Sequence, residues 1–594
     1  MIGAMYCLFP FAALGMAVPP AEDGGAAVAR EGELARRIEM ARDRMLHGET
    51  PRFTDDFILA DVALRPDYPR RFSNYSGDLS GRYLDAFARM PAAGTKQQLH
   101  GLVAKLLPFQ KPDGRFGTAA LEYTPEKIAL DHMALLWGNG RLLVGLLECH
   151  ALQPDEEVLL ACAKLGDFLL GVHEGCADER VTQRVEDLGA AGMICFSQLI
   201  EGLVMLAAAT DNHAYLDGAE AIVPWFPTDR GQQHSHGYLT TLRGMVMLHE
   251  ATGKAEYLAK VEALYADLVG SPDYQVYGGV QEYFGGKGDR DEGCSEADFL
   301  RLSLQLWRAT GNLDYLERAE RCLLNQFYAN QFDTGDFGHQ LHFAQGMAPH
   351  CGVGRAWWCC TMHGLRAFRD VLDSVATKRD GALTVNLFLD AAWSDANCVV
   401  TLERTGASAA KSAFSITVEK APAEGVRIAL RKPEWADRVA LAVNGKDAEA
   451  SEQDGYVTLG TPLHGGDRLD IAFALRSRIV KRDRTVLNLD QLTQEPIEGA
   501  LFHGPWLLGV DEAHAPQFFG EPWTGNEILL SQGLERAGVG EGSLAIPAAH
   551  IPCEYIHEGF PGRHPLTLRP ISERTTHSPA TFAAWLKYRR ADTK

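Results

Sequence analysis

The stretch Ala309-Thr310-Gly311-Asn312-Leu313-Asp314-Tyr315-Leu316 decides the fold, because related stretches begin at Ala209 and Ala251. Each copy ends one apolar helix, turns at Gly or Asp, and starts a second helix whose Tyr-Leu pair is expected to face inward. Such helical hairpins cannot bury their apolar faces alone, so they must stack on neighbouring hairpins. The sequence therefore predicts a region of packed helical hairpins.

This helical region extends on both sides of the three copies. A helix is expected around Glu33 to Leu46, and the polar loop Asn74-Tyr75-Ser76-Gly77 leads into an amphipathic helix. Helical patterns continue to about residue 378, and the uneven distances between the copies exclude a strict solenoid. A closed helical toroid, or (α/α) barrel, with loop insertions fits better, and we assign residues 21–379 to it.

Strand patterns replace helical patterns near residue 380. Leu383–Leu389 alternates at period two, and 398–402, 427–430, 439–443 and 469–473 also read as strands. The dipeptide Asn444-Gly445 is a strong hairpin signal. We expect a β-sandwich over residues 380–480 and a second β-rich domain over 481–594. The fold class is then multidomain α + β, with an (α/α) barrel followed by β-sandwich domains.

Composition narrows the choice of partners. The chain has 594 residues, too many for one ordinary core, and its 46% hydrophobic and 23% charged content is that of a soluble globular protein. A net charge of −21 without a concentrated basic stripe argues against nucleic acid. Beyond the N-terminus, no run approaches the roughly 20 apolar residues of a membrane span. The oligomeric state has no signature in the sequence.

The N-terminus has the composition of an export signal. Residues 1–18 are uncharged and mostly apolar, Gly15-Met16-Ala17 supplies small residues near a cleavage point, and Pro19-Pro20 follows. The usual Lys or Arg near the start is missing, so a trimmed or misassigned start is the alternative. We expect a signal peptide over residues 1–20 and a periplasmic or extracellular location.

Two short stretches carry an unusual group of thiols. Ala356-Trp357-Trp358-Cys359-Cys360 runs into an expected helix, and Glu292-Gly293-Cys294 lies upstream. Zinc binds thiolates and carboxylates in a tetrahedral shell, so one hypothesis is a zinc ion shared by the two stretches. Small cysteines buried in the core are the alternative, and Cys351 is a rival ligand.

These stretches also carry a resemblance to a known family. The chain resembles glycoside hydrolase family 127, the β-L-arabinofuranosidase-like enzymes, over most of residues 70–575. The specific matches are Glu292-Gly293-Cys294 and Trp358-Cys359-Cys360, each followed by an expected helix. Supporting matches are Phe72-Ser73-Asn74 with Gly77-Asp78 and Gly81-Arg82-Tyr83, and Leu568-Arg569-Pro570-Ile571.

The resemblance implies a metal site and a nucleophile. Glu292, Cys294, Cys359 and Cys360 would bind Zn²⁺, whereas Cys351 has no counterpart in the family motif. Cys359 would also attack the anomeric carbon and form a thioglycosyl intermediate. This chemistry is reasonable because zinc deprotonates a coordinated thiol, and the thiolate is the reactive form.

A retaining glycosidase also needs a carboxylic acid that protonates the leaving oxygen and then activates water. The family places this acid in a context that Gln281-Glu282-Tyr283-Phe284 resembles, so Glu282 is the candidate, with a solvated loop carboxylate as the alternative. Asp291 and Glu296 are rivals for the same role. The interval from Glu282 to Glu292 is shorter than in the family.

Three residues are candidates for substrate binding. His236 resembles a family histidine in the sugar pocket, although a helix cap is an equal alternative. Arg82 lines the pocket or forms a structural ion pair with Asp78, and Trp358, with Trp357, stacks on a sugar or packs in the core. The chain departs from the family at Asn139-Gly140-Arg141, where relatives have Asn-Gly-His, and at Ser197, where they have a histidine. These departures put the arabinofuranose specificity in doubt.

The sequence thus predicts a zinc-dependent retaining glycosidase with a cysteine nucleophile, β-L-arabinofuranosidase-like, whose substrate is a plant or microbial oligo- or polysaccharide. A lyase or epimerase on the same toroid would need a Tyr, His or Arg base instead of a thiolate. A non-catalytic glycan-binding protein with structural zinc is the alternative of a different class.

Overall fold

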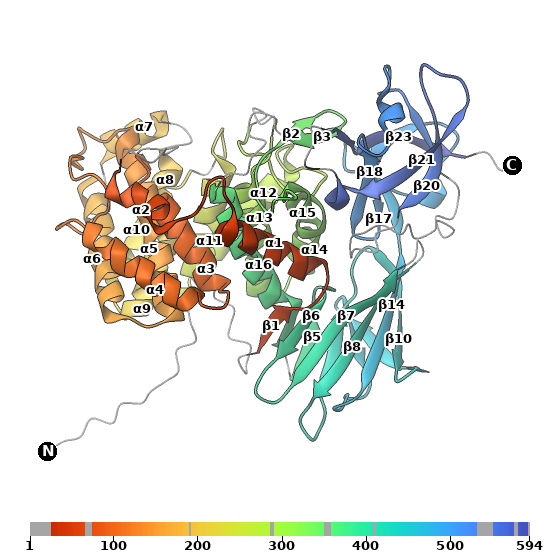
Figure 1. The fold of residues 1–594 in the computed structure, drawn as a ribbon, viewed down its shortest axis with the longest axis horizontal. Coiled ribbons are helices and arrows are strands. Elements are labelled where there is room, and N and C mark those ends of the chain that lie inside the picture. The colour runs from red at the N-terminus through yellow and green to blue at the C-terminus, as the bar shows by residue number, and fades with distance from the viewer. Residues whose placement is uncertain are drawn as a thin grey trace. The chain divides into compact units, whose positions relative to one another are not determined.

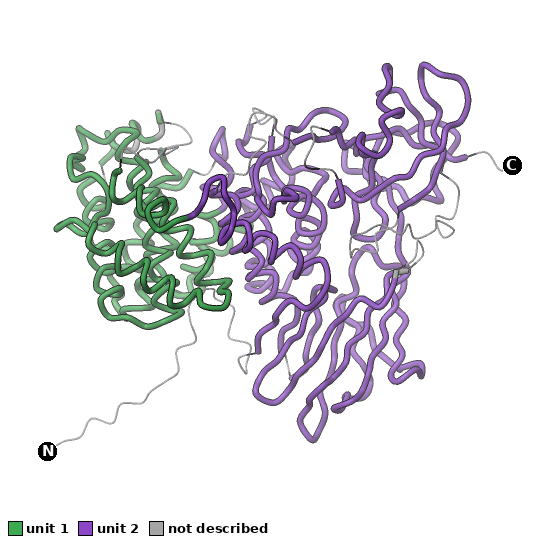
Figure 2. Tube along the Cα trace, in the orientation of Figure 1, with its two compact units in different colours: residues 1–20, 54–229, 240–262 green, residues 21–53, 230–239, 263–594 purple. Residues whose placement is uncertain are grey.

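The computed structural model describes residues 25–65, 74–176, 178–188, 192–227, 229–285, 290–349, 358–379, 381–407, 411–530, 550–574, 576 and 580–591. The chain divides into two compact units (Figure 2). Unit 1 contains residues 54–229 and 240–262, and unit 2 contains residues 21–53, 230–239 and 263–594. The expected signal peptide, residues 1–20, lies outside the described residues.

Unit 1 is built from helices, coloured orange to yellow in Figure 1. Met193–Thr210 has the length and composition to cross a membrane, but 83% of this stretch is buried inside the protein, as in a core helix. In chain order the helices are α2 (Asp55–Ala63), α3 (Asp78–Arg89), α4 (Thr95–Leu106), α5 (Leu130–Leu152), α6 (Glu156–Cys176), α7 (Glu179–Asp187), α8 (Met193–Ser197), α9 (Leu199–Thr210) and α10 (Ala214–Ile222).

The repeated hairpin signal forms the turns that it predicts. Between successive helices, Asp211, Gly253 and Gly311 adopt left-handed φ angles of 54°, 70° and 73°, which Gly adopts without strain. The tyrosine of each copy is buried, and in the third copy Leu316 is buried as well. Leu216 and Leu258 are only half-buried, so the inward Tyr-Leu pair is complete in one copy of three.

The remaining helices carry the second and third hairpins and the N-terminal helix. α11 (Ser235–Thr252) and α12 (Ala255–Gly270) each have residues in both units. The other helices belong to unit 2 and are α1 (Glu33–His47), α13 (Gly293–Thr310), α14 (Leu313–Arg321), α15 (Tyr328–Asn330) and α16 (Trp358–Val375), with a π-helical turn over Cys322–Phe327.

Helices α13 and α16 pack against each other, and this packing sets the position of their first turns relative to each other. The guanidinium group of Arg301 on α13 donates to Asp370 on α16, and both side chains are buried. α13 ends at Gly311, whose N–H donates to the Trp307 carbonyl oxygen over 2.7 Å. The first turns of these two helices hold the thiols singled out by the sequence.

Two sheets form the middle of the chain, within the described residues. The seven-stranded sheet has the order β1 (Ala26–Ala29), β6 (Ala391–Ser394), β7 (Val399–Ala407), β8 (Lys411–Lys420), β14 (Arg468–Leu475), β10 (Ala436–Val443) and β11 (Lys446–Asp447). The five-stranded sheet has the order β12 (Ala450–Gln453), β13 (Tyr456–Leu459), β9 (Arg427–Arg431), β5 (Ala382–Val385) and β4 (Ala376–Arg379).

The expected strands are present, with one correction. β5 ends at Val385, so the strand expected over Leu383–Leu389 is shorter than its alternation suggested. Asn444 and Gly445 turn between β10 and β11 with φ angles of 51° and 77°, which is the predicted hairpin turn. β1 comes from the N-terminal side of the helical region and pairs with β6, which local sequence patterns did not reveal.

The C-terminal strands close into a ring. β17 and β18 pair with each other and are also joined through β23, β19, β20 and β21, so these six strands have no free edge along the ring. The complete order in the described residues is β16 (Val486–Asn488), β15 (Ser477–Val480), β17 (Ile497–His503), β23 (Trp585–Arg590), β19 (Glu527–Leu530), β20 (Ile551–Ile556), β21 (Arg563–Pro570), β18 (Trp506–Asp511), β22 (Phe582–Ala583), β3 (Gly346–Pro349) and β2 (Gln340–Phe343).

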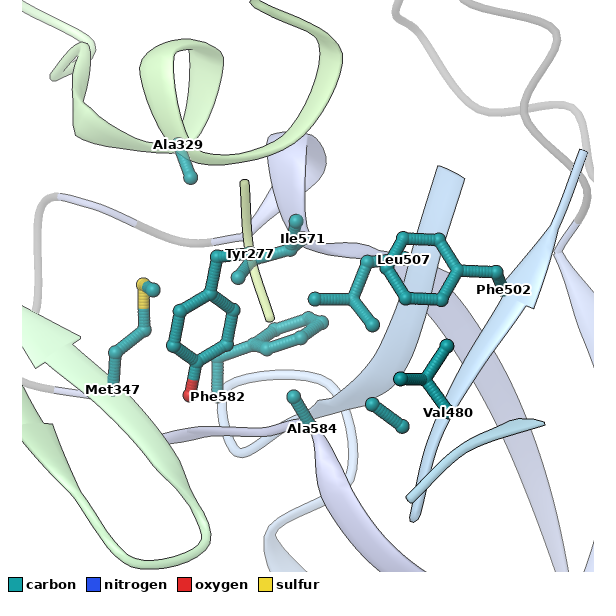
Figure 3. Close-up of a cluster of buried hydrophobic side chains, with 10 residues drawn as sticks. Tyr277, Ala329, Met347, Val480, Phe502, Leu507, Ile571, Phe582 and Ala584 are labelled. Atoms are coloured by element: carbon teal, nitrogen blue, oxygen red, sulfur yellow. The ribbon is translucent and has the colours of Figure 1, made fainter. Parts of the chain in front are cut away.

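One apolar cluster joins the helical part of unit 2 to this ring (Figure 3). Tyr277 and Ala329 come from the helical part and Met347 from strand β3, and they pack with Phe502 and Phe582 of the C-terminal strands. The β2–β3 hairpin, which contains Met347, pairs with β22. The confirmed fold class is therefore a helical region followed by β-rich domains, and within unit 2 the two share a core.

Candidate active site

The starts of α13 and α16 bring three thiols and one carboxylate together. Glu292 immediately precedes α13 in an extended conformation, and Cys294 lies in its first turn. Cys359 and Cys360 lie in the first turn of α16. Ligand atoms of all four residues lie within 4.8 Å of one another. The two stretches that the zinc hypothesis joined are thus neighbours in space.

The spacing of these atoms fits one zinc ion. Cys294 Sγ lies 3.7 Å from Cys360 Sγ, which lies 4.0 Å from both Cys359 Sγ and a Glu292 carboxylate oxygen. Sulfurs bound at 2.3 Å in a tetrahedral shell are separated by about 3.8 Å, so these distances match the edges of such a shell. Three thiols and a carboxylate are also a donor set that zinc accepts.

The protonation of the buried thiols supports the same interpretation. Burial raises the pKa of Cys294 and Cys360 well above the usual range, so these thiols stay neutral unless a cation compensates them. Cys294 and Cys360 are 0% exposed and Cys359 is 8% exposed, so Cys359 is the most exposed residue of the three. The set is therefore suited to holding a divalent cation with one thiol at the edge of the site.

Glu292 has a second partner in His234. His234 Nε2 lies 3.1 Å from Glu292 Oε2. Burial by itself would raise the pKa of Glu292, but the charge and hydrogen bond of His234 outweigh it and hold this pKa below its ordinary value. Burial by itself would lower the pKa of His234, but the carboxylates of Glu292 and then Glu282 outweigh burial, so the pKa of His234 is raised. The carboxylate is therefore kept ionised, the form that a metal ligand needs.

Glu282 lies beside this group. Its carboxylate receives a hydrogen bond from Arg290 Nε, and Glu282 Oε1 lies 3.9 Å from His234 Nε2 and 3.6 Å from His339 Nε2. Ligand atoms of Glu282, His234 and Glu292 lie within 4.8 Å of one another. The candidate acid/base residue is thus adjacent to the candidate metal ligands, despite the short interval in sequence.

The two rival carboxylates have structural contacts. Asp291 is buried and accepts hydrogen bonds from Gln326, Asn330 and the backbone N–H of Gln340. Glu296 is buried and accepts from the N–H of Val280 over 3.3 Å, and its burial raises its pKa well above the ordinary value. Both side chains hold neighbouring segments together.

A second buried cluster orients His236. Asp298 Oδ2 lies 2.5 Å from His236 Nδ1, and Asp298 Oδ1 lies 2.9 Å from His363 Nε2. Arg301 approaches the same carboxylate at 3.4 Å. Two ligands on one metal ion, each about 2.0–2.2 Å from it, are farther apart than 2.5 Å in a tetrahedral shell. These contacts are therefore a hydrogen-bond network, and they fix the orientation of the His236 ring.

The other sequence candidates are placed as follows. Arg82 lies in unit 1, where its Nε donates to Asp78 Oδ1 over 2.7 Å, the structural ion pair considered as its alternative. Ser197, also in unit 1, is hydrogen-bonded to Thr241 over 3.0 Å. Trp358 is half-buried at the start of α16. Trp357 and Cys351 lie outside the described residues.

Sequence reasoning missed His234, His339, Asp298 and Arg290. His234 had a weak signal, since it lies two residues before His236 in Gln233-His234-Ser235-His236. Arg290 and Asp298 flank the Glu292-Gly293-Cys294 motif without belonging to it, and His339 lies in a segment without a motif. Tertiary packing brings His339 to Glu282 and Asp298 to His236.

Comparison with known families identifies the class of protein. Residues 71–373 match the β-L-arabinofuranosidase GH127 catalytic domain, and residues 382–475 match the GH127 middle domain. The protein is therefore a glycoside hydrolase. It belongs to the GH127 β-L-arabinofuranosidase family, which confirms the resemblance.

Solved structures agree on the fold. A GH127 β-L-arabinofuranosidase from Geobacillus stearothermophilus T6 is 14% identical, with a TM-score of 0.67 over 95% of this chain and 100% of that chain. A second GH127 β-arabinofuranosidase is 15% identical, with a TM-score of 0.68 over 95% of this chain and 96% of that chain. No curated protein matches the chain.

Proposed function

We propose that the protein is a zinc-dependent, retaining β-L-arabinofuranosidase whose nucleophile is Cys359. The observation that carries the proposal is the group of Glu292, Cys294, Cys359 and Cys360 at distances that suit one tetrahedral ion. The family match supports the sugar, since the matched domains are those of β-L-arabinofuranosidases.

In this proposal the four residues hold Zn²⁺, which, when bound, keeps their thiols deprotonated at neutral pH. Cys359 then attacks the anomeric carbon as a thiolate, so a carbon–sulfur bond forms while the bond to the leaving oxygen breaks. Glu282 gives its proton to that oxygen. In the second half, Glu282 takes a proton from water, the water attacks the anomeric carbon, and the carbon–sulfur bond breaks. Two displacements return the original anomeric configuration.

The neighbours of Glu282 support its double role. Arg290 holds one carboxylate oxygen, and His234 and His339 approach the other. Glu282 is 6% exposed, so its carboxylate is buried among these neighbours. An acid/base residue must keep its position through both proton transfers, and three neighbours provide that restraint.

His236 is proposed to contact the sugar. Its Nδ1–H donates to Asp298, and in this proposal its Nε2 is the ring nitrogen that meets a sugar hydroxyl. His236 stacks edge-on against His363, with ring centroids 4.9 Å apart, so the ring has little freedom to turn.

The central test is the replacement Cys359→Ala. We expect kcat for an aryl β-L-arabinofuranoside to fall by more than about 10³-fold, because the nucleophile is gone. Cys553→Ala is the matched control, because Cys553 lies in β20 and is not among the candidate ligands. Wild-type activity in Cys359→Ala, or a purified protein without bound zinc by elemental analysis, would contradict the proposal.

Glu282→Gln tests the acid. We expect a loss of about 10²–10⁴-fold on a substrate with a sugar leaving group. The loss should be smaller on a nitrophenyl glycoside, since nitrophenolate leaves without a proton. Equal losses on both substrates would argue that Glu282 does not protonate the leaving group. Proton NMR of the first-formed product would check retention of configuration.

A further inference from the structure

Unit 2 contains a cavity of about 260 Å³ that shares no lining residue with the candidate active site. One wall is α14, a second is the segment that leads into β10, and a third is β15 with the turn that follows it. The helical part, the middle sheets and the C-terminal strands therefore all contribute side chains to it. Its lining is rich in charge, with four carboxylates and four arginines, the latter being Arg318, Arg321, Arg478 and Arg484.

None of these arginines forms an ion pair within the described part of the chain. Arg318 donates to the carbonyl oxygen of Asp314 over 3.1 Å, and Arg478 donates to that of Gly504 over 3.2 Å. Arg484 donates to the carbonyl oxygens of Val269 and Ser271. A guanidinium has five N–H donors, so these one or two contacts leave donors available to the cavity.

Two acidic residues of the lining share an ion-pair partner, an arginine outside the lining. Arg431, which is buried and lies outside the lining, forms ion pairs with Glu317 at 3.0 Å and with Glu320. Glu320 also accepts a hydrogen bond from Trp435 Nε1 over 2.7 Å. These two carboxylates therefore point to Arg431, and Asp314 and Glu434 are the other acidic residues of the lining.

Arg478 and Arg321 crowd the same side of the cavity. Their guanidinium carbons lie 5.1 Å and 4.9 Å from the centroid of the Phe502 ring. Arg478 is only 6% exposed, and its burial, together with Arg321, lowers its pKa to about 10. It stays charged at neutral pH, so two like charges lie near one ring, and the carboxylates of Glu434 and Glu317 act on Arg478 without forming an ion pair with it in the described residues. A bound anion would remove that repulsion.

We propose that this cavity is a second, non-catalytic sugar site that binds a carboxylate-bearing sugar unit, a uronic acid. The planar carboxylate suits the forked donors of Arg321 and Arg478. The exposed carboxylates of Asp314 and Glu434 also line the cavity, and they accept hydrogen bonds from sugar hydroxyls. A lining of cations together with acceptors fits a hydroxylated anion better than an inorganic one.

The size of the cavity limits the ligand to a small unit. Sites for drug-sized ligands enclose about 300–1,000 Å³, so 260 Å³ suits a single sugar residue. Tyr274 and Trp435 add aromatic side chains to the wall. Since no lining residue belongs to the candidate active site, binding here does not depend on zinc or on Cys359.

Calorimetric titration of the full-length protein with sodium galacturonate and sodium glucuronate tests the proposal. We expect a Kd on the order of 1 mM for at least one of them. The control ligands are the neutral sugars galactose and glucose and the non-sugar anions acetate and inorganic phosphate. Each control ligand is expected to bind at least 10-fold more weakly than the uronate. Cys359→Ala should bind the uronate as the parent does, because the active site is not involved.

Arg321→Gln and Arg478→Gln should each weaken uronate binding by at least 10-fold and leave hydrolysis of an aryl arabinofuranoside unchanged. Arg476→Gln is the matched control, since Arg476 pairs with Asp437 and is not in the lining. Arg321 is partly exposed, so its variant keeps the test valid if Arg478→Gln fails to fold. Equal binding of galactose, acetate or phosphate, or unchanged binding by Arg321→Gln, would overturn the proposal.

Discussion

Asp298 links three segments that meet at the candidate site. It lies on α13 and accepts hydrogen bonds from His236 at the start of α11 and from His363 on α16. Its pKa lies well below the ordinary value, because the two histidines outweigh the effect of burial. A carboxylate accepts from both rings at once, whereas a neutral amide offers one acceptor and one donor group. Asp298 is therefore a positioning residue for His236.

Asp298→Asn should lower kcat/KM for the arabinofuranoside by about 10–100-fold, since hydrogen bonds to charged groups contribute about 1.5–3 kcal/mol each. If Asp298 acts through His236, Asp298→Asn should lower kcat/KM much less in a His236→Ala background than in the parent. A double-mutant cycle measures this difference. Asp373→Asn, on α16 but paired with Arg369, is the control. If the kcat/KM losses of the two single variants add fully in the double variant, Asp298 does not act through His236.

The candidate metal ligands could be proposed from the sequence because the two motifs that carry the family resemblance are local. Glu292 and Cys294 are separated by one residue, and Cys359 and Cys360 are adjacent. His339 and Asp298 had no such signal, because each meets its partner only after distant segments pack: Asp298 lies 62 residues from His236. The acid/base side of the site was accordingly the less complete part of the prediction.

At the scale of the element, α1 is tied to the rest of unit 2 through Glu33 and Arg37. Glu33 Oε1 accepts from Arg37 Nε over 2.6 Å, and Arg37 reaches the carbonyl oxygens of Tyr328 and Ser572. Burial by itself would raise the pKa of Glu33, but Arg37 and Arg36 outweigh it and lower this pKa. The carboxylate thus stabilises the fold at pH values above its unfolded pKa, and this contribution is lost as the pH falls through the lower folded pKa.

Glu33→Gln should therefore destabilise the protein at pH 7 by about 1–3 kcal/mol. The difference from the parent should shrink as the pH falls below about 4.3, where the parent carboxyl also becomes protonated. Calorimetric Tm values between pH 3 and 8 would check this. Glu39→Gln is the control, since Glu39 is an exposed residue of the same helix and should change stability by less than about 0.5 kcal/mol. A pH-independent difference would contradict the assignment.

Elements were predictable where their signals were local. The hairpin turns at Asp211, Gly253 and Gly311 and the turn at Asn444-Gly445 depend on residues that tolerate positive φ, and such residues can be read from the sequence. Pairings between distant segments could not be read in this way. β1 joins β6 across more than 360 residues, and the ring closes partly through the parallel pair β19–β23.

At the scale of the whole molecule, unit 2 combines helices and strands around shared apolar residues. Phe582 pairs with Met347 of the β2–β3 hairpin, and both side chains belong to the cluster in Figure 3. Gln340 of the same hairpin donates its backbone N–H to Asp291, the neighbour of Glu292. The C-terminal strands are therefore physically connected to the segment that carries a candidate zinc ligand.

Phe582→Ala should accordingly destabilise more than the C-terminal strands. We expect a loss of about 3–5 kcal/mol, because the truncation leaves a cavity in the cluster. Bound zinc and arabinofuranosidase activity should disappear in the same urea transition as the far-UV signal of the helices. Phe560→Ala is the matched control, since Phe560 is 56% exposed and should lose less than about 0.5 kcal/mol. If Phe582→Ala unfolds the strands in an early transition while zinc and activity persist to a later one, the two parts of unit 2 fold independently and the shared core does not couple them.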